Sequence, residues 1–435
     1  MIDPGLIGAI LIGGLVVLLA IGAPVSISIA LPSAVCMLLI AGFDNGAVTS
    51  AQQMVRGANS FALLAIPFFV LAGVIMNNGG IAERLINLAR VLVGRMPAPL
   101  AQTNVLANAI FGTVSGSAVA SAAAVGATMA PMQRKEGYDP AFTAAANVAS
   151  APAGMLIPPS NTLIIYSLAA GGTSVGALFL AGYVPGFLWA LACAVVVFVY
   201  ARRHPNLKGK PWPHASVILA TFLKALPSLG LIVVAIGGIV AGFFTPTEGS
   251  AIAVLYALAL SFVYRTIKVR ELPRILLEAC RTSSIVIFLI AVSTIMGFVM
   301  AYSRLPQLMA EGLFGWTDSK IVVLLIMMLL LLVIGIPLDP TPAILIFTPI
   351  FLPIAISYGI DPVHFGIMMV FNLSIAVISP PSAPVLFVGA QVAKVRLDHV
   401  IKHLMPFMAV LVVLLFIIVF VPEVSLALPR LFGLM

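Results

Sequence analysis

Two prolines and a serine interrupt an apolar segment at two places in this chain, as Pro158-Pro159-Ser160 and, 222 residues later, as Pro380-Pro381-Ser382. The same offset aligns residues 131–160 with residues 353–382 without a gap. Within this window the matched pairs are Pro131 and Pro353, Gly137 and Gly359, Asp139 and Asp361, Pro140 and Pro362, and Val148 and Val370. Proline breaks repeated at one fixed spacing indicate two copies of a single membrane unit.

The composition is that of a protein that lies in a membrane. Apolar residues make up 62% of the 435 positions and charged residues only 8%, and the mean hydropathy is +1.18. Soluble globular proteins have far more charge. Many nearly uncharged windows have the ~20 residues that a helix needs to cross a hydrocarbon core of ~30 Å. We therefore expect an all-α, multi-pass protein of the bacterial inner membrane.

Several classes of function are disfavoured by the sequence. The net charge of +8 comes from basic residues that suit membrane loops, so no nucleic-acid partner is expected. The three cysteines, Cys36, Cys193 and Cys280, lie far apart and predict neither disulfides nor a metal site. The chain has no P-loop and no H-E-x-x-H motif, and we predict that it is not an enzyme. The first apolar segment, from about Gly5, has no cleavage signal and is read as a retained helix.

Apolar runs and their breaks predict the same order of elements in both halves. The unbroken helices are expected at about 5–21, 24–42, 61–78, 175–201, 217–241, 245–264, 283–302 and 400–421. The broken segments are expected at 100–131, 140–171, 321–356 and 362–393. Two stretches that mix basic and apolar residues, 81–95 and 266–281, fit helices along the inner interface. The predicted organisation is a first repeat at 1–201, a cytoplasmic linker at 202–216 and a second repeat at 217–435.

The segment at 100–131 decides the topology. It has small and polar residues at its middle, Ser115-Gly116-Ser117, which suits a re-entrant hairpin better than one span. Each repeat then crosses the membrane five times, and the odd number predicts inverted repeats. With five crossings per repeat, eighteen of the 22 basic residues lie on one side of the membrane. By the positive-inside rule this side is cytoplasmic, and both termini are then predicted to be periplasmic. The other side holds Arg56, Arg304, Lys320 and Arg430.

Four helix breaks carry the groups that can bind a ligand. They are Ser115-Gly116-Ser117, Pro158-Pro159-Ser160-Asn161, Pro337-Leu338-Asp339-Pro340-Thr341 and Ser379-Pro380-Pro381-Ser382. Freed backbone groups are tolerated in a membrane only where protein or a water-filled cavity satisfies them. Hydroxyls, a carboxylate and carbonyls suit a small hard cation, while the N-termini of half-helices attract an anion. The pattern favours a cation-coupled anion carrier, although small-residue packing for the serines and simple kinks at the prolines remain alternatives.

Asp339 is the acidic residue that lies most clearly in an apolar context, where a functional role is the default reading. The alternative is that it caps a helix beginning at Pro340, and both can hold. Glu248 is expected to be a first-turn acid of a helix. Arg304 is expected in a solvated loop, with contact to substrate or partner as the alternative. His364 is expected in a surface turn with Asp361.

The chain resembles the large membrane subunit of tripartite ATP-independent periplasmic (TRAP) transporters over essentially its whole length. The motifs that carry the resemblance are Ser115-Gly116-Ser117-Ala118-Val119-Ala120, Gly137-Tyr138-Asp139-Pro140, Leu156-Ile157-Pro158-Pro159-Ser160, Thr245-Pro246-Thr247-Glu248, and Gly335 to Thr341. The resemblance implies a sodium-driven secondary transporter of the elevator type. It also implies a carboxylate substrate, such as a sialic acid or a C4-dicarboxylate, a periplasmic substrate-binding protein, and a small four-helix membrane subunit.

By similarity to divalent-anion/sodium symporters, the resemblance also implies two sodium sites. One would use Ser115, Gly116, Ser117 and the segment Pro158, Pro159, Ser160 and Asn161. The other would use Asp339, Thr341 and the segment Ile378, Ser379, Pro380, Pro381 and Ser382. The substrate would lie between the tips, near Ser117, Ser160, Asn161, Pro340 and Ser382. The moving unit would be 100–171 and 321–393, and the remainder the scaffold.

Other functions remain open at this point. The chain could be a proton- or sodium-coupled symporter that works without a binding protein, an anion channel, or a scaffold for transporting partners. A proton antiporter is less well supported, because such pumps usually need more than one buried ionisable residue and only Asp339 is convincing.

Overall fold

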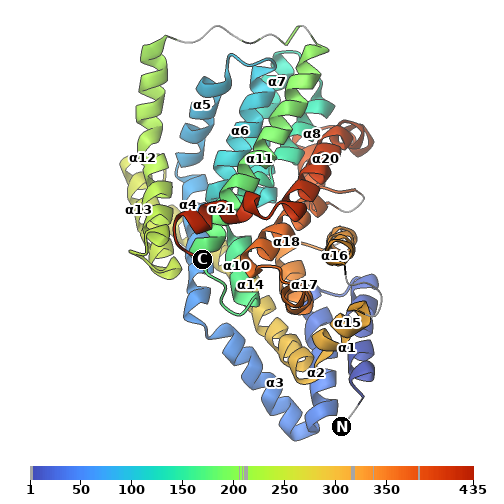
Figure 1. Cartoon of the computed structure of the whole chain (residues 1–435). Helices are drawn as coiled ribbons and strands as arrows, with labels where there is room; N and C mark the ends of the chain where they lie inside the picture. Colours follow the sequence, from blue (N-terminus) through green and yellow to red (C-terminus); the bar gives the residue numbers. More distant parts are fainter. Residues whose placement is uncertain are drawn as a thin grey trace.

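The chain is built from helices (Figure 1). The computed structural model describes residues 3–204, 206–207, 209, 214–314, 319–336, 338–380 and 383–435, and these contain no strand. The helices of the first half are α1 (Pro4–Ala20), α2 (Val25–Ala41), α3 (Phe43–Ala58), η1 (Phe61–Leu64), α4 (Ala65–Asn78), α5 (Ile81–Val93), α6 (Pro99–Ser115), α7 (Ala118–Lys135), α8 (Pro140–Ser150), α9 (Ala153–Leu156), α10 (Asn161–Ala169) and α11 (Val175–Arg202).

The second half follows a similar order. Its helices are α12 (Ala215–Val240), α13 (Pro246–Val263), η2 (Val269–Glu271), α14 (Leu272–Tyr302), α15 (Leu305–Phe314), α16 (Lys320–Gly335), α17 (Pro340–Ser357), α18 (Pro362–Ala376), α19 (Pro384–Ala393), α20 (Leu397–Phe420) and α21 (Glu423–Leu431). In the described residues, seven helical segments are long and apolar enough to cross a membrane, and the bent pair α8–α9 and α10 makes an eighth candidate. The prediction of an all-α multi-pass membrane protein is therefore confirmed.

Positions matched at the 222-residue offset have the same local structure in both halves. Asp139 and Asp361 are the N-caps of α8 and α18, and each accepts a hydrogen bond from the backbone N–H two residues on, at 2.9 and 2.8 Å. A proline follows each cap at the first helical position, an arrangement that favours helix initiation. Gly137 and Gly359 both have a positive φ, +77° and +69°. The inverted orientation of the two halves stays a prediction.

Each half contains a helical hairpin that packs on a broken helix. In the first, α6 turns into α7 at Gly116, and α6 lies so close to α9 that a Cβ on Gly154 would come within 2.1 Å of Gly112. In the second, α16 precedes α17, and a Cβ on Gly335 would come within 2.7 Å of the Ala376 Cβ at the end of α18. Small residues thus allow close contact between hairpin and break in both halves.

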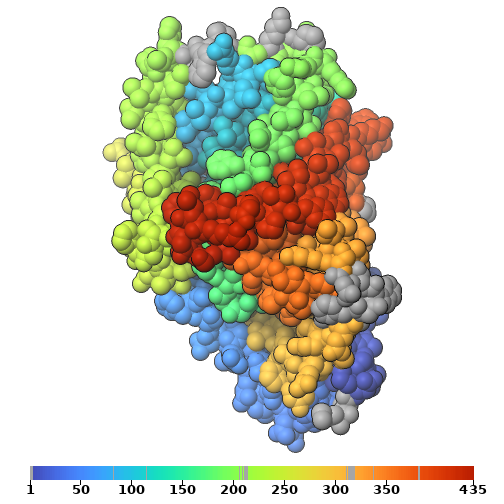
Figure 2. All heavy atoms as spheres, in the orientation of Figure 1, coloured from blue at the N-terminus to red at the C-terminus, as the bar shows by residue number. Residues whose placement is uncertain are grey.

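The helices form two groups. In one group the hairpins and broken helices pack with α11 and α20; in the other, α1 to α5 pack with α12 to α14. Figure 1 shows α12 and α13 along one side and α1, α2 and α3 at the opposite end from the hairpin α6–α7. Figure 2 shows α20 and α21 as one red band across this face, and α21 packs on α11 and α18.

Some elements differ from the sequence-based expectations. The stretch 266–281 is not a separate interfacial helix, because η2 leads directly into the continuous 31-residue helix α14. Its Pro273 sits in the first turn, where proline is tolerated, so nothing breaks the helix. Helices α3, α15 and α21 were not expected. The first of these, α3, is polar and amphipathic, with no long apolar run to reveal it.

Candidate functional site

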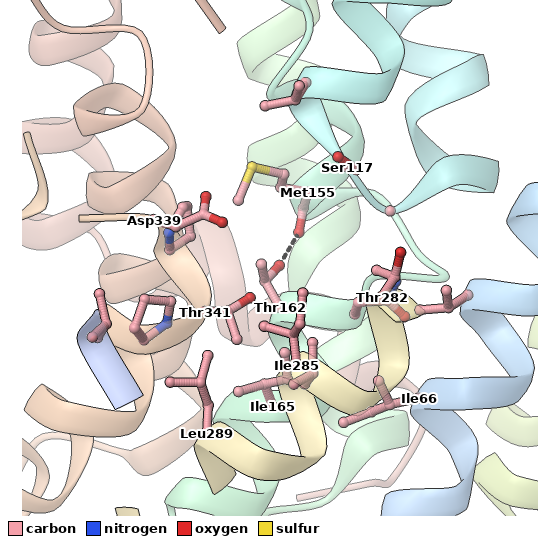
Figure 3. Close-up of a pocket in the computed structure, with 18 of the residues that line it drawn as sticks. Ile66, Ser117, Met155, Thr162, Ile165, Thr282, Ile285, Leu289, Asp339 and Thr341 are labelled. Atoms are coloured by element: carbon pink, nitrogen blue, oxygen red, sulfur yellow. Dashed lines mark hydrogen bonds between the residues drawn. The ribbon is translucent and has the colours of Figure 1, made fainter. Parts of the chain in front are cut away.

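A cavity of about 690 Å³ lies between the two groups of helices (Figure 3). Its polar lining comes mainly from residues at or next to the helix breaks, namely Gly116, Ser117, Asn161, Thr162, Asp339 and Thr341, and Ser26 on α2 and Thr282 on α14 add two hydroxyls on the other side. Its apolar wall comes mainly from α4 and α14, through Ile66, Val70, Ile285, Val286, Phe288 and Leu289. In Figure 3, Asp339 and Thr341 face the same space as Thr162 and Ser117, with Ile66, Ile285 and Leu289 below them. One cavity therefore joins residues from both repeats.

The first hairpin tip contacts the first broken helix. Gly116 has a φ of +60°, a conformation that glycine adopts without strain. A Cβ at this position would come within 2.7 Å of the Asn161 Nδ2 atom. The Ser117 hydroxyl accepts a hydrogen bond from the Ala120 N–H at 3.3 Å and so caps α7. The Ser115 hydroxyl donates to the Ser117 carbonyl oxygen at 3.3 Å, and Ser115 does not line the cavity.

The residues of the first break differ in whether they reach the cavity. Asn161 lines the cavity, whereas Pro158, Pro159 and Ser160 are buried behind it. The Ser160 hydroxyl donates to the Met155 carbonyl oxygen and accepts from the Leu163 N–H, so it caps α10. Neighbouring Thr162, which does line the cavity, donates to the same Met155 oxygen at 2.9 Å. Ser160 thus stabilises the break from inside the protein.

The second hairpin tip presents Asp339 to the cavity. Asp339 is the residue before α17 and Pro340 is the first helical residue, as an Asp-Pro start predicts. Its carboxylate nevertheless makes no capping hydrogen bond. The side chain is exposed toward the cavity, and Pro340 and Thr341 lie beside it. Asp339 therefore occupies the predicted N-cap position, but its carboxylate oxygens do not cap the helix.

The second break is only partly described. Of its residues, Val377 lines the cavity, whereas Ile378, Ser379 and Pro380 do not. The Ser379 hydroxyl donates to the Ile375 carbonyl oxygen at 2.8 Å, and Ile378 is fully buried. The predicted ligands Pro381 and Ser382, and Pro337 at the tip, lie outside the described residues.

The remaining candidates have other environments. Glu248 forms a capping box with Thr245, its carboxylate accepting from the Thr245 N–H at 2.8 Å, which confirms a first-turn acid. Arg304 is exposed in the turn before α15 and does not line the cavity. The expectation for His364 was wrong: it is 3% exposed, and its Nδ1 lies 2.6 Å from the hydroxyl of Ser425 on α21. His364 is buried because α21, which was not expected from the sequence, packs on α18.

Sequence reasoning missed the wall that faces the tips. The α14 residues Thr282, Ile285 and Leu289 line the cavity, but the region around Thr282 looked like the end of an interfacial helix. Met155 and Thr162 also line the cavity, and their closeness in sequence to Pro158-Pro159 was the signal that could have found them.

A buried network of polar side chains fixes the first hairpin. The Asn108 Nδ2 group donates to the Asn147 Oδ1 atom and to the Ser150 hydroxyl, both at 2.9 Å. Its Oδ1 atom accepts from the Ser121 hydroxyl at 2.8 Å. Asn147 in turn donates to the Ala122 carbonyl oxygen at 2.8 Å. Because these residues come from α6, α7 and α8, the network ties both arms of the hairpin to the helix that leads into the first break.

Replacing Asn108 with leucine is expected to lower the free energy of unfolding by roughly 2–4 kcal/mol, because several buried polar groups lose their partners at once. Thermal unfolding of the purified protein in detergent measures the loss. Thr128→Ala changes an exposed polar residue on α7 and should have little effect. Equal unfolding temperatures for the two variants would show that the network is dispensable for stability.

The fold and cavity define the class of protein. Among the described residues that line the cavity, Asp339 is the only ionisable one, and no group of three or more His, Cys, Asp or Glu occurs in the described part of the chain. The cavity offers hydroxyl, amide and carboxylate oxygens together with an apolar wall, in a multi-pass helical protein. These are features of a membrane carrier.

The family model for the tripartite ATP-independent periplasmic transporter, DctM component, matches residues 12–424. The chain belongs to this family, whose members are transporter subunits and not enzymes. It is 53% identical to the uncharacterized protein YgiK of Salmonella typhimurium, over 98% of this chain and 97% of that protein. It is 39% identical to the C4-dicarboxylate TRAP transporter large permease protein DctM of Pseudomonas aeruginosa, over 94% and 95%.

A solved structure shares the fold. The YdaH transporter of Alcanivorax borkumensis, described as having an unusual topology, matches with a TM-score of 0.58 at 16% identity. The match covers 87% of this chain and 89% of the transporter. At this identity the likeness concerns the fold alone.

Proposed function

We propose that this chain is the large membrane subunit of a sodium-coupled importer that moves an organic carboxylate by an elevator mechanism. The substrate would be delivered by a periplasmic binding protein, and a small membrane subunit would complete the transporter. Family membership supports the two partners, and relatives named as permeases for C4-dicarboxylate, sialic acid and 2,3-diketo-L-gulonate support an organic carboxylate as the substrate. We propose that both termini lie in the periplasm, because most basic residues then lie on the cytoplasmic side.

The observation that carries the proposal is the set of polar groups that share one cavity. The N-terminal ends of α7, α10 and α17 all reach it, through Ala118, Asn161 and Pro340. Helix N-termini carry partial positive charge and attract an anion. Asp339, Thr341 and Ser117 add hard oxygen atoms suited to sodium. Anion and cation would therefore stabilise each other in one site.

We assign sodium to two places beside the substrate. One lies between the tip Ser115-Gly116-Ser117 and the first break, where Gly116 already contacts Asn161. The other lies between Asp339, Thr341 and the second break, whose Val377 reaches the cavity. Filling both places would order the tips before the substrate binds, which couples the two ligands.

Helix packing supports a larger moving unit than residues 100–171 and 321–393. Helix α11 packs on α6, α9 and α18, and α20 packs on α8, α11 and α18. A polar contact of 3.2 Å between the Asp139 carboxylate before α8 and the His403 Nε2 atom on α20 joins them further. We therefore include α11 and α20 in the moving unit. The scaffold would be α1 to α5 and α12 to α14, whose apolar wall faces the tips.

Reconstitution of the complete transporter tests the proposal. Uptake of a radiolabelled organic acid into proteoliposomes is expected only with an inward sodium gradient and with the binding protein outside. If a proton gradient without a sodium gradient drives uptake equally well, sodium is not the required coupling ion. Uptake without the binding protein would favour an independent symporter, and gradient-independent flux in both directions would favour a channel.

A further inference from the structure

We propose that the start of α13, Pro246-Thr247-Glu248, replaces the start of α2 as scaffold wall of the cavity in the opposite transport state, which places the Glu248 carboxylate beside the site. This inference rests on the proposed function, because it needs a moving unit with two positions. Its basis is a difference between the two parts of the lining: the tips of both repeats reach the cavity, whereas only one of two equivalent scaffold helices does so with its start.

The moving unit lines the cavity with equivalent residues from both repeats. Four pairs related by the 222-residue offset line it, namely Ser117 and Asp339, Ala118 and Pro340, Val119 and Thr341, and Met155 and Val377. If the two repeats exchange their environments, these eight residues therefore still form one site.

The scaffold also consists of equivalent helices. The offset that pairs the tips also pairs Ser28 on α2 with Ser250 on α13, and both serines are fully buried. Helix α2 ends at Ala41 and α13 at the equivalent residue Val263. Helix α2 packs on α1 and α14, and α13 packs on the corresponding helices α12 and α4. The scaffold thus contains two equivalent helix starts.

Only one of these helix starts faces the cavity in this structure. Pro24-Val25-Ser26 lines it, whereas the equivalent Pro246-Thr247-Glu248 does not. The contacts between scaffold and moving unit are unequal in the same way. Helix α4 packs on α6 and α10, while α14, as far as the described residues extend, has no comparable packing on α16 and α19. Exchanging these contacts between the repeats gives a second arrangement, in which the start of α13 faces the tips.

The two helix starts differ in charge. Ser26 brings a hydroxyl to the cavity, whereas Glu248 would bring a carboxylate that accepts hydrogen bonds from the Thr245 N–H and hydroxyl at 2.8 and 2.9 Å. With both termini in the periplasm, α2 starts on the cytoplasmic side and α13 on the periplasmic side. The opposite state is then outward-facing, and its additional carboxylate attracts external sodium to the site.

Irreversible cross-linking of the complete transporter in membranes tests the proposal. Val119→Cys is combined with Ser26→Cys or with Glu248→Cys, the exposed Cys280 is replaced by serine, and a flexible bis-maleimide is added in potassium chloride. Both pairs should cross-link, because a symporter must also return empty and so visits both states. Each cross-link should stop uptake. Val263→Cys, exposed at the other end of α13, is the matched control and should not cross-link to Val119→Cys.

A charge-neutral variant gives a second measurement that does not depend on cysteines. Glutamine in Glu248→Gln can still complete the capping box, so α13 should remain intact. The variant should raise the external sodium concentration for half-maximal uptake roughly two- to fivefold, the range for an exposed charge pair. Glu271→Gln is its control, because Glu271 accepts from the Lys268 N–H in a similar cap and does not line the cavity.

The outcomes separate this inference from the proposed function. Absence of the Glu248 cross-link, or equal cross-linking at Val263, overturns the inference, while sodium-driven uptake would leave the proposed function intact. Cross-linking of both pairs in a transporter whose uptake ignores sodium would remove the proposed coupling and keep α13 as the second wall. An unchanged sodium requirement in Glu248→Gln would show that this carboxylate lies away from the site.

Discussion

Replacing Asp339 with asparagine is expected to reduce sodium-driven uptake roughly 10- to 100-fold at limiting sodium, the loss expected when a charge-assisted contact becomes a neutral one. The carboxylate faces the cavity, makes no capping hydrogen bond and is the only ionisable group in the described lining. Asparagine keeps the shape and can still occupy the N-cap position, so α17 should begin at the same residue. The measurement is initial uptake as a function of sodium concentration.

Asp361→Asn provides the matched control. Asp361 also precedes a proline that starts a helix, but it caps α18 through the Val363 N–H and does not line the cavity. Its asparagine variant should transport normally. If the Asp339 variant shows wild-type uptake with an unchanged sodium dependence, Asp339 is not a sodium ligand and its position reflects helix initiation alone.

Much of the architecture was predictable because membrane helices leave strong signals. Lipid requires long uncharged runs, and backbone breaks need special residues, so the hairpins and Pro-Pro breaks were visible in the sequence. The turn at Ser115-Gly116-Ser117 joins α6 and α7 as expected, and Asp339 stands at the second tip. Amphipathic helices such as α3 and α21 carry a weaker signal, and their position depends on the surface they pack against.

The cavity was predictable only in part, because the sequence carries a recognisable signal for one of its two sides and not for the other. The polar side consists of break residues, which local sequence marks. The apolar side consists mainly of ordinary isoleucine, leucine, valine and phenylalanine on α4 and α14, and nothing distinguishes these from lipid-facing residues until the fold brings them to the tips. Likewise, Ser160 was predicted to lie at a sodium and substrate site from its place in the break, whereas only the folded chain shows that its hydroxyl caps α10 and donates to the Met155 carbonyl oxygen.

Gly116→Ala is the second change with a large expected effect, because it alters the first hairpin tip in two ways. Alanine at a φ of +60° costs about 1–2 kcal/mol in backbone conformation. Its methyl group would also lie 2.7 Å from the Asn161 Nδ2 atom, closer than van der Waals contact, so the tip or Asn161 must move. Since Asn161 lines the cavity beside Ser117, we expect uptake to fall by roughly 10-fold or more, as for other small displacements of positioned ligands.

Gly137→Ala separates these two contributions. Gly137 also has a positive φ, +77°, but no atom lies within 4 Å of a Cβ built there. Both variants should therefore lose stability in thermal unfolding through backbone strain, the Gly116 variant more because of its close contact with Asn161, and only the Gly116 variant should lose uptake and require more sodium for half-maximal rate. Equal loss of uptake in the two variants would assign the effect to backbone strain. The contact between the hairpin tip and the broken helix would then have no part in forming the site.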